Sequence, residues 1–340
     1  MKSRASSRVV QFALLVGLLG LTSTSVLAQG DDLPLIRRTE YGVPHILAND
    51  YRGVGIGLGY AQVEDYGDRI ILGLLRSKAM MGVTFGRDSM QSDFGARRDL
   101  LRVTETYHLL DAETRGVYEG FAEGVNIFIR SHPERVPAWA RPIFNGHDIA
   151  ARDIGGASTA AAQRIAQRHS GQPVSTGEDI DAPHPDDGSN AWAFAPSRTK
   201  SGRAILLRNP HLAWSSGYWE AHVTIPGKLN YYGDFRIGGP FAVVGGFNEH
   251  LGWATTNNAP DNDEVYVLDA DTTRADHYIF DGVSQPLRRE DVTVDVTTPT
   301  GVQQETRSFW HTTLGPVVHR TRERVYIARA GGDNEYRAGQ

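Results

Sequence analysis

The chain has 340 residues, a formal net charge of −5, 40% hydrophobic residues and no cysteine. This composition is typical of a globular protein with a sizeable core, and it argues against a nucleic-acid partner because no excess of basic side chains can neutralise phosphates. The lack of cysteine excludes disulfides, thiolate metal sites and a cysteine nucleophile.

Residues 1–28 have the pattern of a signal peptide. Lys2, Arg4 and Arg8 precede a mostly apolar run, and residues 26–28 form a small-x-small cleavage site. An uncleaved membrane anchor is the alternative, although the apolar run is short for a bilayer span. We therefore expect an exported protein, periplasmic or secreted, with no membrane partner once the signal is removed.

The next segment combines a strand pair with two helices. Residues 35–48 alternate apolar and polar side chains around a turn-like 41–44, which predicts strand, turn and strand. Apolar residues recur at helical spacing over 58–81 and again over 112–130. Both predicted helices are expected to be core scaffolding.

Residues 151–188 differ in composition from both flanks. They are rich in small residues, proline and aspartate and contain few large apolar side chains, so we predict a spacer or linker. From residue 189 onward the pattern changes to strands, with alternation over 219–225, 251–255 and 292–296 and glycine or proline between them. This part is predicted to be sheet-rich and antiparallel.

Two short motifs suggest chemistry only weakly. Ser197 and Lys200 fit the S-x-x-K pattern of serine β-lactamases, but no Ser-Asp-Asn or Lys-Thr-Gly partner follows. Residues 261–264 begin like a calcium loop, but they lack the glycine at which an EF-hand turns. A solvated acidic turn is the simpler interpretation of the second motif.

Ser189 has a sharper pattern, because it follows Gly188 at the end of the spacer and begins a strand. If the chain were cut before it, Ser189 would carry an α-amine, with a reference pKa of roughly 7.7–8.0, beside its own hydroxyl. Nucleophile and base would then be on one residue. Glycine lacks Cβ and lets the backbone reach strained conformations. From the residues alone, an ordinary turn remains the alternative.

Several motifs together resemble the penicillin acylase family of N-terminal-nucleophile hydrolases, nearest to its cephalosporin and acyl-homoserine-lactone acylase branch. In the second half they are GSNAW at 188–192, NPHL at 209–212, EAH at 220–222 and LGPV at 314–317. In the first half they are IRR at 36–38, YGVPHI at 41–46, GYAQ at 59–62 and GVN at 124–126. The resemblance covers nearly all of residues 33–330.

The resemblance implies an α+β fold, the four-layer αββα sandwich with antiparallel sheets, incomplete in this chain. It implies a precursor that cuts itself before Ser189 into an α/β heterodimer. The α-chain would be 29–150, the spacer 151–188, and the first part of the β-chain 189–340. The reaction implied is hydrolysis of the amide between an acyl group and an amine, with a small-molecule substrate and no organic cofactor.

The resemblance also assigns roles to single residues. Ser189 would be the nucleophile, His211 would help to orient it, and the backbone N–H of Asn257 would stabilise the oxyanion. Asp261 and Glu264 match two ligands of a structural calcium in the penicillin G acylase branch, a metal that the branch with Asn-Pro-His often lacks.

The family's β-chain supplies a second oxyanion asparagine and an arginine from positions that would lie past Gln340. We therefore expect a fragment or a truncated product. The alternative function is a catalytically inactive remnant or binding protein of the same fold.

Aromatic residues and one histidine near these motifs are assigned to structure rather than chemistry. His45 is expected to be structural, and Trp192, Phe194 and Trp214 to lie in the core or a pocket wall. Tyr218 and Trp219 fit either an acyl pocket or ordinary packing.

Overall fold

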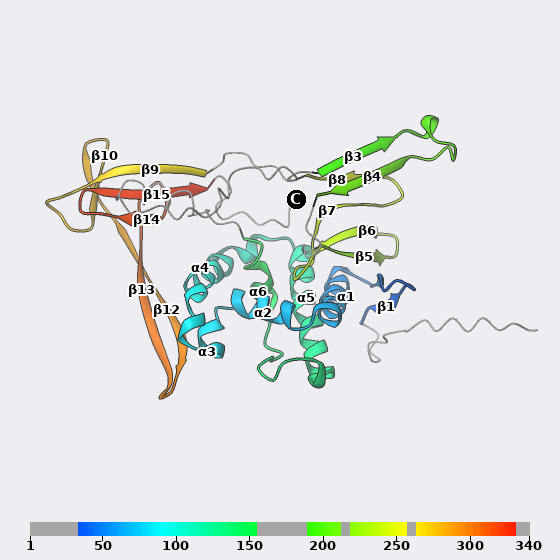
Figure 1. The fold of residues 1–340 in the computed structure, drawn as a ribbon, viewed down its shortest axis with the longest axis horizontal. Coiled ribbons are helices and arrows are strands. Elements are labelled where there is room, and N and C mark those ends of the chain that lie inside the picture. Colours follow the sequence, from blue (N-terminus) through cyan, green and yellow to red (C-terminus); the bar gives the residue numbers. More distant parts are fainter. Residues whose placement is uncertain (1–32, 155–188, 212–217, 257–262, 331–340) are drawn as a thin grey trace, which may run out of the picture.

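A computed structural model describes residues 33–154, 189–211, 218–256 and 263–330 (Figure 1). The predicted signal peptide, most of the predicted spacer, and the residues Trp214, Asn257 and Asp261 lie outside these ranges. The described elements are mixed α+β, as the sequence predicted.

Six α-helices occupy the first half of the described chain. They are α1 (Tyr51–Tyr66), α2 (Asp68–Ser77), α3 (Met81–Phe85), α4 (Gln91–Thr106), α5 (Ala112–Ser131) and α6 (Gly146–Ala150). The prediction for 112–130 is confirmed by α5, which begins at its N-cap Asp111, whose carboxylate accepts hydrogen bonds from two backbone N–H groups. The single helix predicted over 58–81 is wrong, because Gly67, at φ +49°, separates α1 from α2.

The largest sheet has six strands in the order β1-β2-β5-β6-β7-β8. They are β1 (Leu35–Arg38), β2 (Pro44–Leu47), β5 (Tyr218–Ile225), β6 (Leu229–Arg236), β7 (Ala242–Phe247) and β8 (Gly252–Ala254). β1 and β2 confirm the predicted strand pair. The β2–β5 pair is parallel, so the antiparallel prediction fails at this one junction of the sheet.

The remaining strands form a second sheet and two ribbons. The second sheet, in the order β11-β10-β9-β15-β14, comprises β9 (Asp263–Ala270), β10 (His277–Phe280), β11 (Val283–Pro286), β14 (Val317–Arg320) and β15 (Arg324–Ala330). One ribbon joins β12 (Arg288–Thr298) to β13 (Gly301–His311) and runs beside α3 and α4 (Figure 1). The other joins β3 (Ser189–Phe194) to β4 (Ile205–Pro210).

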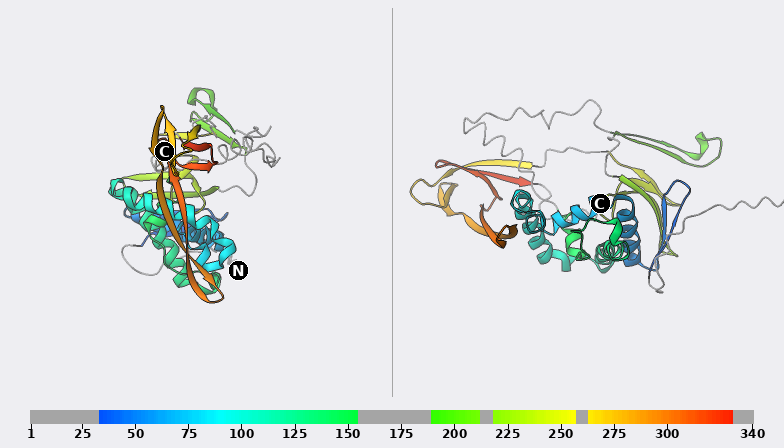
Figure 2. Two further views of the ribbon diagram at one scale, coloured as in Figure 1. Left: turned by 90° about the vertical axis from the view of Figure 1, so that its left-hand side faces the viewer. Right: turned by 60° about the horizontal axis from the view of Figure 1, so that its bottom comes forward.

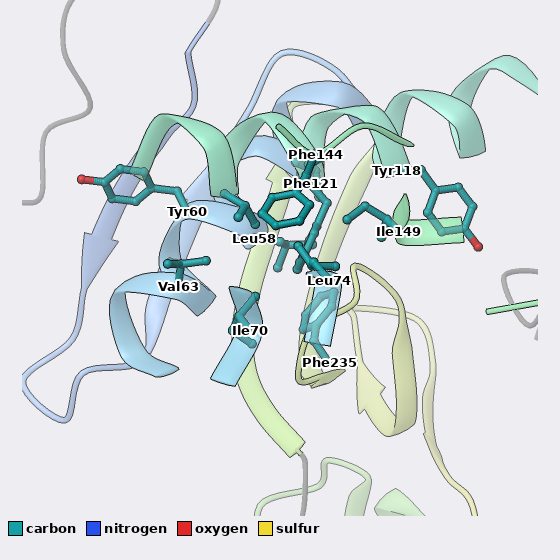
Figure 3. Close-up of a cluster of buried hydrophobic side chains, with 14 of the residues drawn as sticks. Leu58, Tyr60, Val63, Ile70, Leu74, Tyr118, Phe121, Phe144, Ile149 and Phe235 are labelled. Carbon is teal, nitrogen blue, oxygen red and sulfur yellow. The ribbon is translucent and has the colours of Figure 1, made fainter. Parts of the chain in front are cut away.

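The main core lies between the helices and one face of the six-stranded sheet (Figures 1 and 2). The predicted alternation in β5 holds, since Trp219, Ala221, Val223 and Ile225 are buried. Figure 3 shows how side chains from the helices meet Phe235 of β6 in this core. Trp219, only 6% exposed, therefore contributes to packing rather than to an open pocket.

A smaller core fixes the long β12–β13 ribbon to the helices. Val292, Val294 and Val296 of β12 pack with Met90 and Phe94. Because alternate residues of a strand point to one face, the valine pattern read from the sequence corresponds to this buried face.

Helices α1 and α5 touch backbone to backbone. A Cβ at Gly55 or Gly59 of α1 would overlap the carbonyl oxygen of Val117 or Phe121 in α5. The contact is reciprocal, because a Cβ at Gly120 or Gly124 of α5 would overlap backbone carbonyls of α1. Small residues four apart on each helix thus set the spacing of the helical layer. In the parts of the chain described, no helix is long and apolar enough to cross a bilayer.

We predict that Gly59→Ala lowers the free energy of unfolding by about 3 kcal/mol, because a backbone carbonyl cannot move aside as a flexible side chain can. The matched control is Gly95→Ala in α4, where a Cβ meets nothing within 4 Å. This control should be neutral or stabilising by about 0.5–1 kcal/mol. Urea unfolding checks both, and equal effects at the two sites would contradict the packing argument.

Candidate active site

Ser189 is the first residue of β3, and the ribbon register places it beside the NPHL motif. Ser189 lies opposite Pro210, and Asn190 lies opposite Asn209, in the antiparallel β3–β4 pair. His211 directly follows Pro210, so the structure brings Ser189 and His211 to the same end of the ribbon. Ser189 is partly buried and His211 is exposed.

Two asparagine side chains lie at this end of the ribbon. The Nδ2 of Asn190 donates to the carbonyl oxygen of Ser189 at 3.1 Å, and the Nδ2 of Asn209 lies 3.4 Å from Nε2 of His211. A hydroxyl, an imidazole and two carboxamides are therefore present within residues 189–190 and 209–211, at one end of the ribbon. A serine hydroxyl and an imidazole are residue types that nucleophilic and general acid–base catalysis use.

The oxyanion donor predicted at Asn257 lies outside the described residues, but the chain leading to it lies near the ribbon. It leaves the six-stranded sheet from β8, and β8 is the strand that neighbours β4. A Cβ at Gly252 of β8 would lie 3.1 Å from the side chain of Leu206 in β4. The role of Asn257 stays a prediction.

The predicted calcium ligands are not assembled in the described residues. Glu264 lies on β9, in the five-stranded sheet, where its carboxylate accepts a hydrogen bond from the Tyr266 hydroxyl and lies 3.9 Å from the guanidinium of Arg329. Within the described ranges no three metal-ligating side chains cluster, and Asp261 lies outside them. The calcium site stays a prediction, because Asp261 lies outside the described residues.

An ion pair that the sequence analysis missed fixes the ribbon to the six-stranded sheet. Arg208 of β4 donates from Nη1 to the carboxylate of Asp234 in β6, and the two side chains are 22% and 9% exposed. This hydrogen bond is the main cause that raises the pKa of Arg208 above its ordinary value. Gly245 of β7 leaves room for the guanidinium, because a Cβ there would lie 3.0 Å from Nη1.

Tyr231 supports the same corner of the sheet. Its hydroxyl donates to the carbonyl oxygen of Gly245 at 3.1 Å, and its ring stacks on Trp253 with centroids 5.2 Å apart. Burial, followed by the negative charge of Asp234, raises the pKa of Tyr231 to about 12. The phenol therefore stays a neutral hydrogen-bond donor at physiological pH.

The outward face of the β3–β4 ribbon is apolar and exposed. Trp192 and Phe194 are each 45% exposed, and their cross-strand partners Leu207 and Ile205 are 53% and 50% exposed. Trp192 and Phe194, predicted to lie in the core or a pocket wall, are therefore not part of a core within the described residues, and the pocket-wall alternative stays a prediction. The opposite face carries Leu206 and Arg208 toward the sheet, and the ribbon extends beyond β8, away from the helices (Figures 1 and 2).

His45, which the sequence assigned to structure, links two strands of the six-stranded sheet. It lies on β2 opposite His222 of β5, with the two Nδ1 atoms 2.9 Å apart, and Nε2 of His222 is 2.7 Å from Oδ1 of Asn230. One ring must accept the shared hydrogen, so at least one imidazole is neutral. Burial, and then the neighbouring His222, lower the pKa of His45 below its ordinary value.

A family model described as penicillin amidase matches residues 35–338 of this chain. The chain belongs to the penicillin amidase family. The motifs around Ser189 and in the first half of the sequence, which suggested this family, all lie inside the matched range.

Two relatives in this family illustrate the degree of similarity. The acyl-homoserine lactone acylase PvdQ of Pseudomonas fluorescens strain ATCC BAA-477 is 31% identical over 316 residues, covering 83% of this chain and 40% of that protein. The aculeacin-A acylase of Actinoplanes utahensis is 26% identical over 322 residues, again 83% and 40%. The chain thus spans about 40% of the length of these relatives.

Among solved structures, the thermostable penicillin G acylase of Alcaligenes faecalis in its orthorhombic form superposes on 41% of this chain and 25% of its own. The TM-score is 0.36 and the sequence identity is 19%.

We predict that Arg208→Ala loosens the ribbon, because Asp234 is left partly buried without its cation. The free energy of unfolding should fall by about 1–3 kcal/mol. Amide hydrogen exchange in residues 189–194 and 205–210 should accelerate more than exchange in α5. Arg203→Ala, an exposed arginine between β3 and β4, is the matched control. Equal protection of the ribbon in both variants would contradict the anchoring role.

We also predict that the protein loses stability as the pH falls through and below the ordinary histidine value of 6.5. Because the folded pKa of His45 is depressed, the unfolded chain binds a proton more readily, and acid therefore favours unfolding. His45→Gln should flatten the pH dependence of unfolding in this range, measured against the exposed control His250→Gln. An unchanged slope in His45→Gln would show that this pair does not titrate with folding.

Proposed function

We propose that this member of the penicillin amidase family is an acylase that hydrolyses the amide between an acyl group and an amine, with Ser189 as nucleophile. The observation that carries the proposal is the β3–β4 register, which puts the serine and histidine of two family motifs at one end of a ribbon. The names of the relatives, acyl-homoserine lactone acylase and aculeacin-A acylase, support an acyl-amide substrate.

The proposed activation begins with cleavage of the peptide bond before Ser189, which creates a new α-amine on that residue. The amine accepts the Oγ proton, through a water molecule, and the oxygen attacks the acyl carbonyl carbon. His211, at the same end of the ribbon, orients the hydroxyl. The backbone N–H of Asn257 donates to the oxyanion, and such a donor is typically worth about 3–4 kcal/mol of barrier.

The proposed reaction then proceeds in two steps. When the tetrahedral intermediate collapses, the carbon–nitrogen bond breaks and the α-amine returns its proton to the departing amine. The acyl group remains on Ser189 as an ester. Water, deprotonated by the same α-amine, attacks this ester, and the free acid leaves as the hydroxyl is restored. At each step the proton moves to or from the α-amine of Ser189. No organic cofactor is required.

The finer features of the family belong to the same proposal. The mature enzyme would be an α/β heterodimer built as a four-layer αββα sandwich, exported to the periplasm or secreted. The packing of the described helices on one face of the six-stranded sheet supports a layered arrangement of this kind.

We predict that the purified full-length protein contains a chain whose first residue is Ser189. Ser189→Ala should remain uncut and should lose at least about 10³-fold in hydrolysis of N-acyl substrates, because nucleophile and base are removed together. Intact-mass spectrometry and amine release from a panel of N-acyl amides measure the two effects. The matched control is Ser197→Ala, an exposed serine in a turn of the same ribbon, which should mature and react normally.

Two results would contradict this proposal. A folded wild-type protein that stays uncut and inactive would favour the non-catalytic alternative. Covalent labelling by a β-lactam at Ser197 would favour the β-lactamase alternative.

A further inference from the structure

A cavity of about 470 Å³ lies between α2 and the turn that links β6 to β7. Its wall contains three arginines, Arg69, Arg76 and Arg152, and a single carboxylate, Asp68. Within the described residues, no hydrogen bond or ion pair joins this wall to the β3–β4 ribbon.

Two glycines make room for Arg152 in the wall of the cavity. The guanidinium donates from Nη1 to the carbonyl oxygen of Gly238 at 2.8 Å. A Cβ at Gly73 of α2 would lie 3.1 Å from the same nitrogen, and a Cβ at Gly238 would overlap it. Gly238 also has φ +82°, a conformation that favours glycine. The backbone on both sides is therefore shaped around this cation.

The side chain of Gln62 forms hydrogen bonds with the turn that carries Gly238. Gln62 of α1 is fully buried, and its Oε1 accepts a hydrogen bond from the Gly238 N–H at 2.7 Å. Its Nε2 donates to the carbonyl oxygens of Arg236 and Gly239. The polar groups of the turn are thereby satisfied, and the Gly238 carbonyl is fixed where it meets Arg152.

The three cavity arginines have no carboxylate partner among the described residues. Elsewhere in the same region Arg236 pairs with Asp153, which also accepts from the Tyr118 hydroxyl at 3.1 Å. Burial, to which Arg236 adds, lowers the pKa of Arg152 to about 10. The charge of Asp153 opposes this shift, but its carboxylate is ion-paired with Arg236. An anionic ligand would therefore offset part of the cost of burying the Arg152 guanidinium.

We propose that this cavity binds the phosphate monoester of a small molecule. The three guanidinium charges exceed the one carboxylate by two, which matches the charge of roughly −1.5 to −2 on a phosphate monoester at neutral pH. Arginine forks suit the geometry of phosphate oxygens. The volume lies in the range of small-molecule pockets and exceeds what a bare phosphate needs. The site is independent of the proposed chemistry at Ser189.

Isothermal titration calorimetry of the full-length protein at low ionic strength tests the proposal with glycerol 3-phosphate, inorganic phosphate and succinate. Glycerol 3-phosphate should bind with one site per chain and more tightly than the other two. Arg76→Gln should weaken this binding by about tenfold or more, since one charge-assisted contact is lost. Arg130→Gln, an exposed arginine on α5, removes the same charge elsewhere and should leave binding unchanged.

Arg152→Gln provides a second variant, expected to abolish binding. Should it fail to fold, the comparison of Arg76→Gln with Arg130→Gln still decides the question. Absence of glycerol 3-phosphate binding, or an equal loss in both of those variants, overturns the site. Tighter binding of succinate overturns the choice of phosphate, and equal or tighter binding of inorganic phosphate overturns the choice of a monoester.

Discussion

The close approach of α1 and α5 is the constraint on which the rest of the structure depends. Glycines on both helices allow the backbones to touch, so the two helices form a single dense layer. The six-stranded sheet packs its apolar face on that layer, with Trp219, Val223 and Phe235 in the shared core. A larger distance between α1 and α5 would displace the helical surface on which the six-stranded sheet packs.

The candidate active site is connected to the six-stranded sheet by an ion pair, beside the approach of Leu206 to β8. The outward face of β6 presents Asp234, and Asp234 holds Arg208 of the ribbon that begins at Ser189. Backbone hydrogen bonds between β3 and β4 then fix the position of Ser189 relative to Arg208. The serine is thus fixed by a partly buried ion pair two ladder positions away. Such a pair is sensitive to loss of either partner.

The sequence predicted those parts of the fold that depend on local pattern. Apolar spacing found α5 and the core face of β5, and the YGVPH segment indicated the turn between β1 and β2. Helix α4 was missed because it is mostly polar and charged, with few buried side chains. The parallel β2–β5 pairing joins residues 177 positions apart, such as His45 and His222, and alternation contains no information on such a partner.

The same difference between local pattern and long-range contact applies to the candidate active site. Motif order was enough to single out Ser189 and His211, because both belong to short contiguous patterns. The Arg208–Asp234 pair and the cavity arginines could not be found this way, since each brings together residues from separate elements.

Trp192 and Phe194 were expected in the core or a pocket wall, and in the described structure they are exposed. A large aromatic side chain indicates that a surface is apolar, but it does not show what covers that surface.

The most direct test of the central claim is a peptide map of the protein quenched during turnover of an N-acyl substrate. The account predicts the acyl group as an ester on the Ser189 hydroxyl, in a peptide whose first residue is Ser189. An acyl group on a different side chain, or an intact bond between Gly188 and Ser189 in catalytically active material, would contradict it.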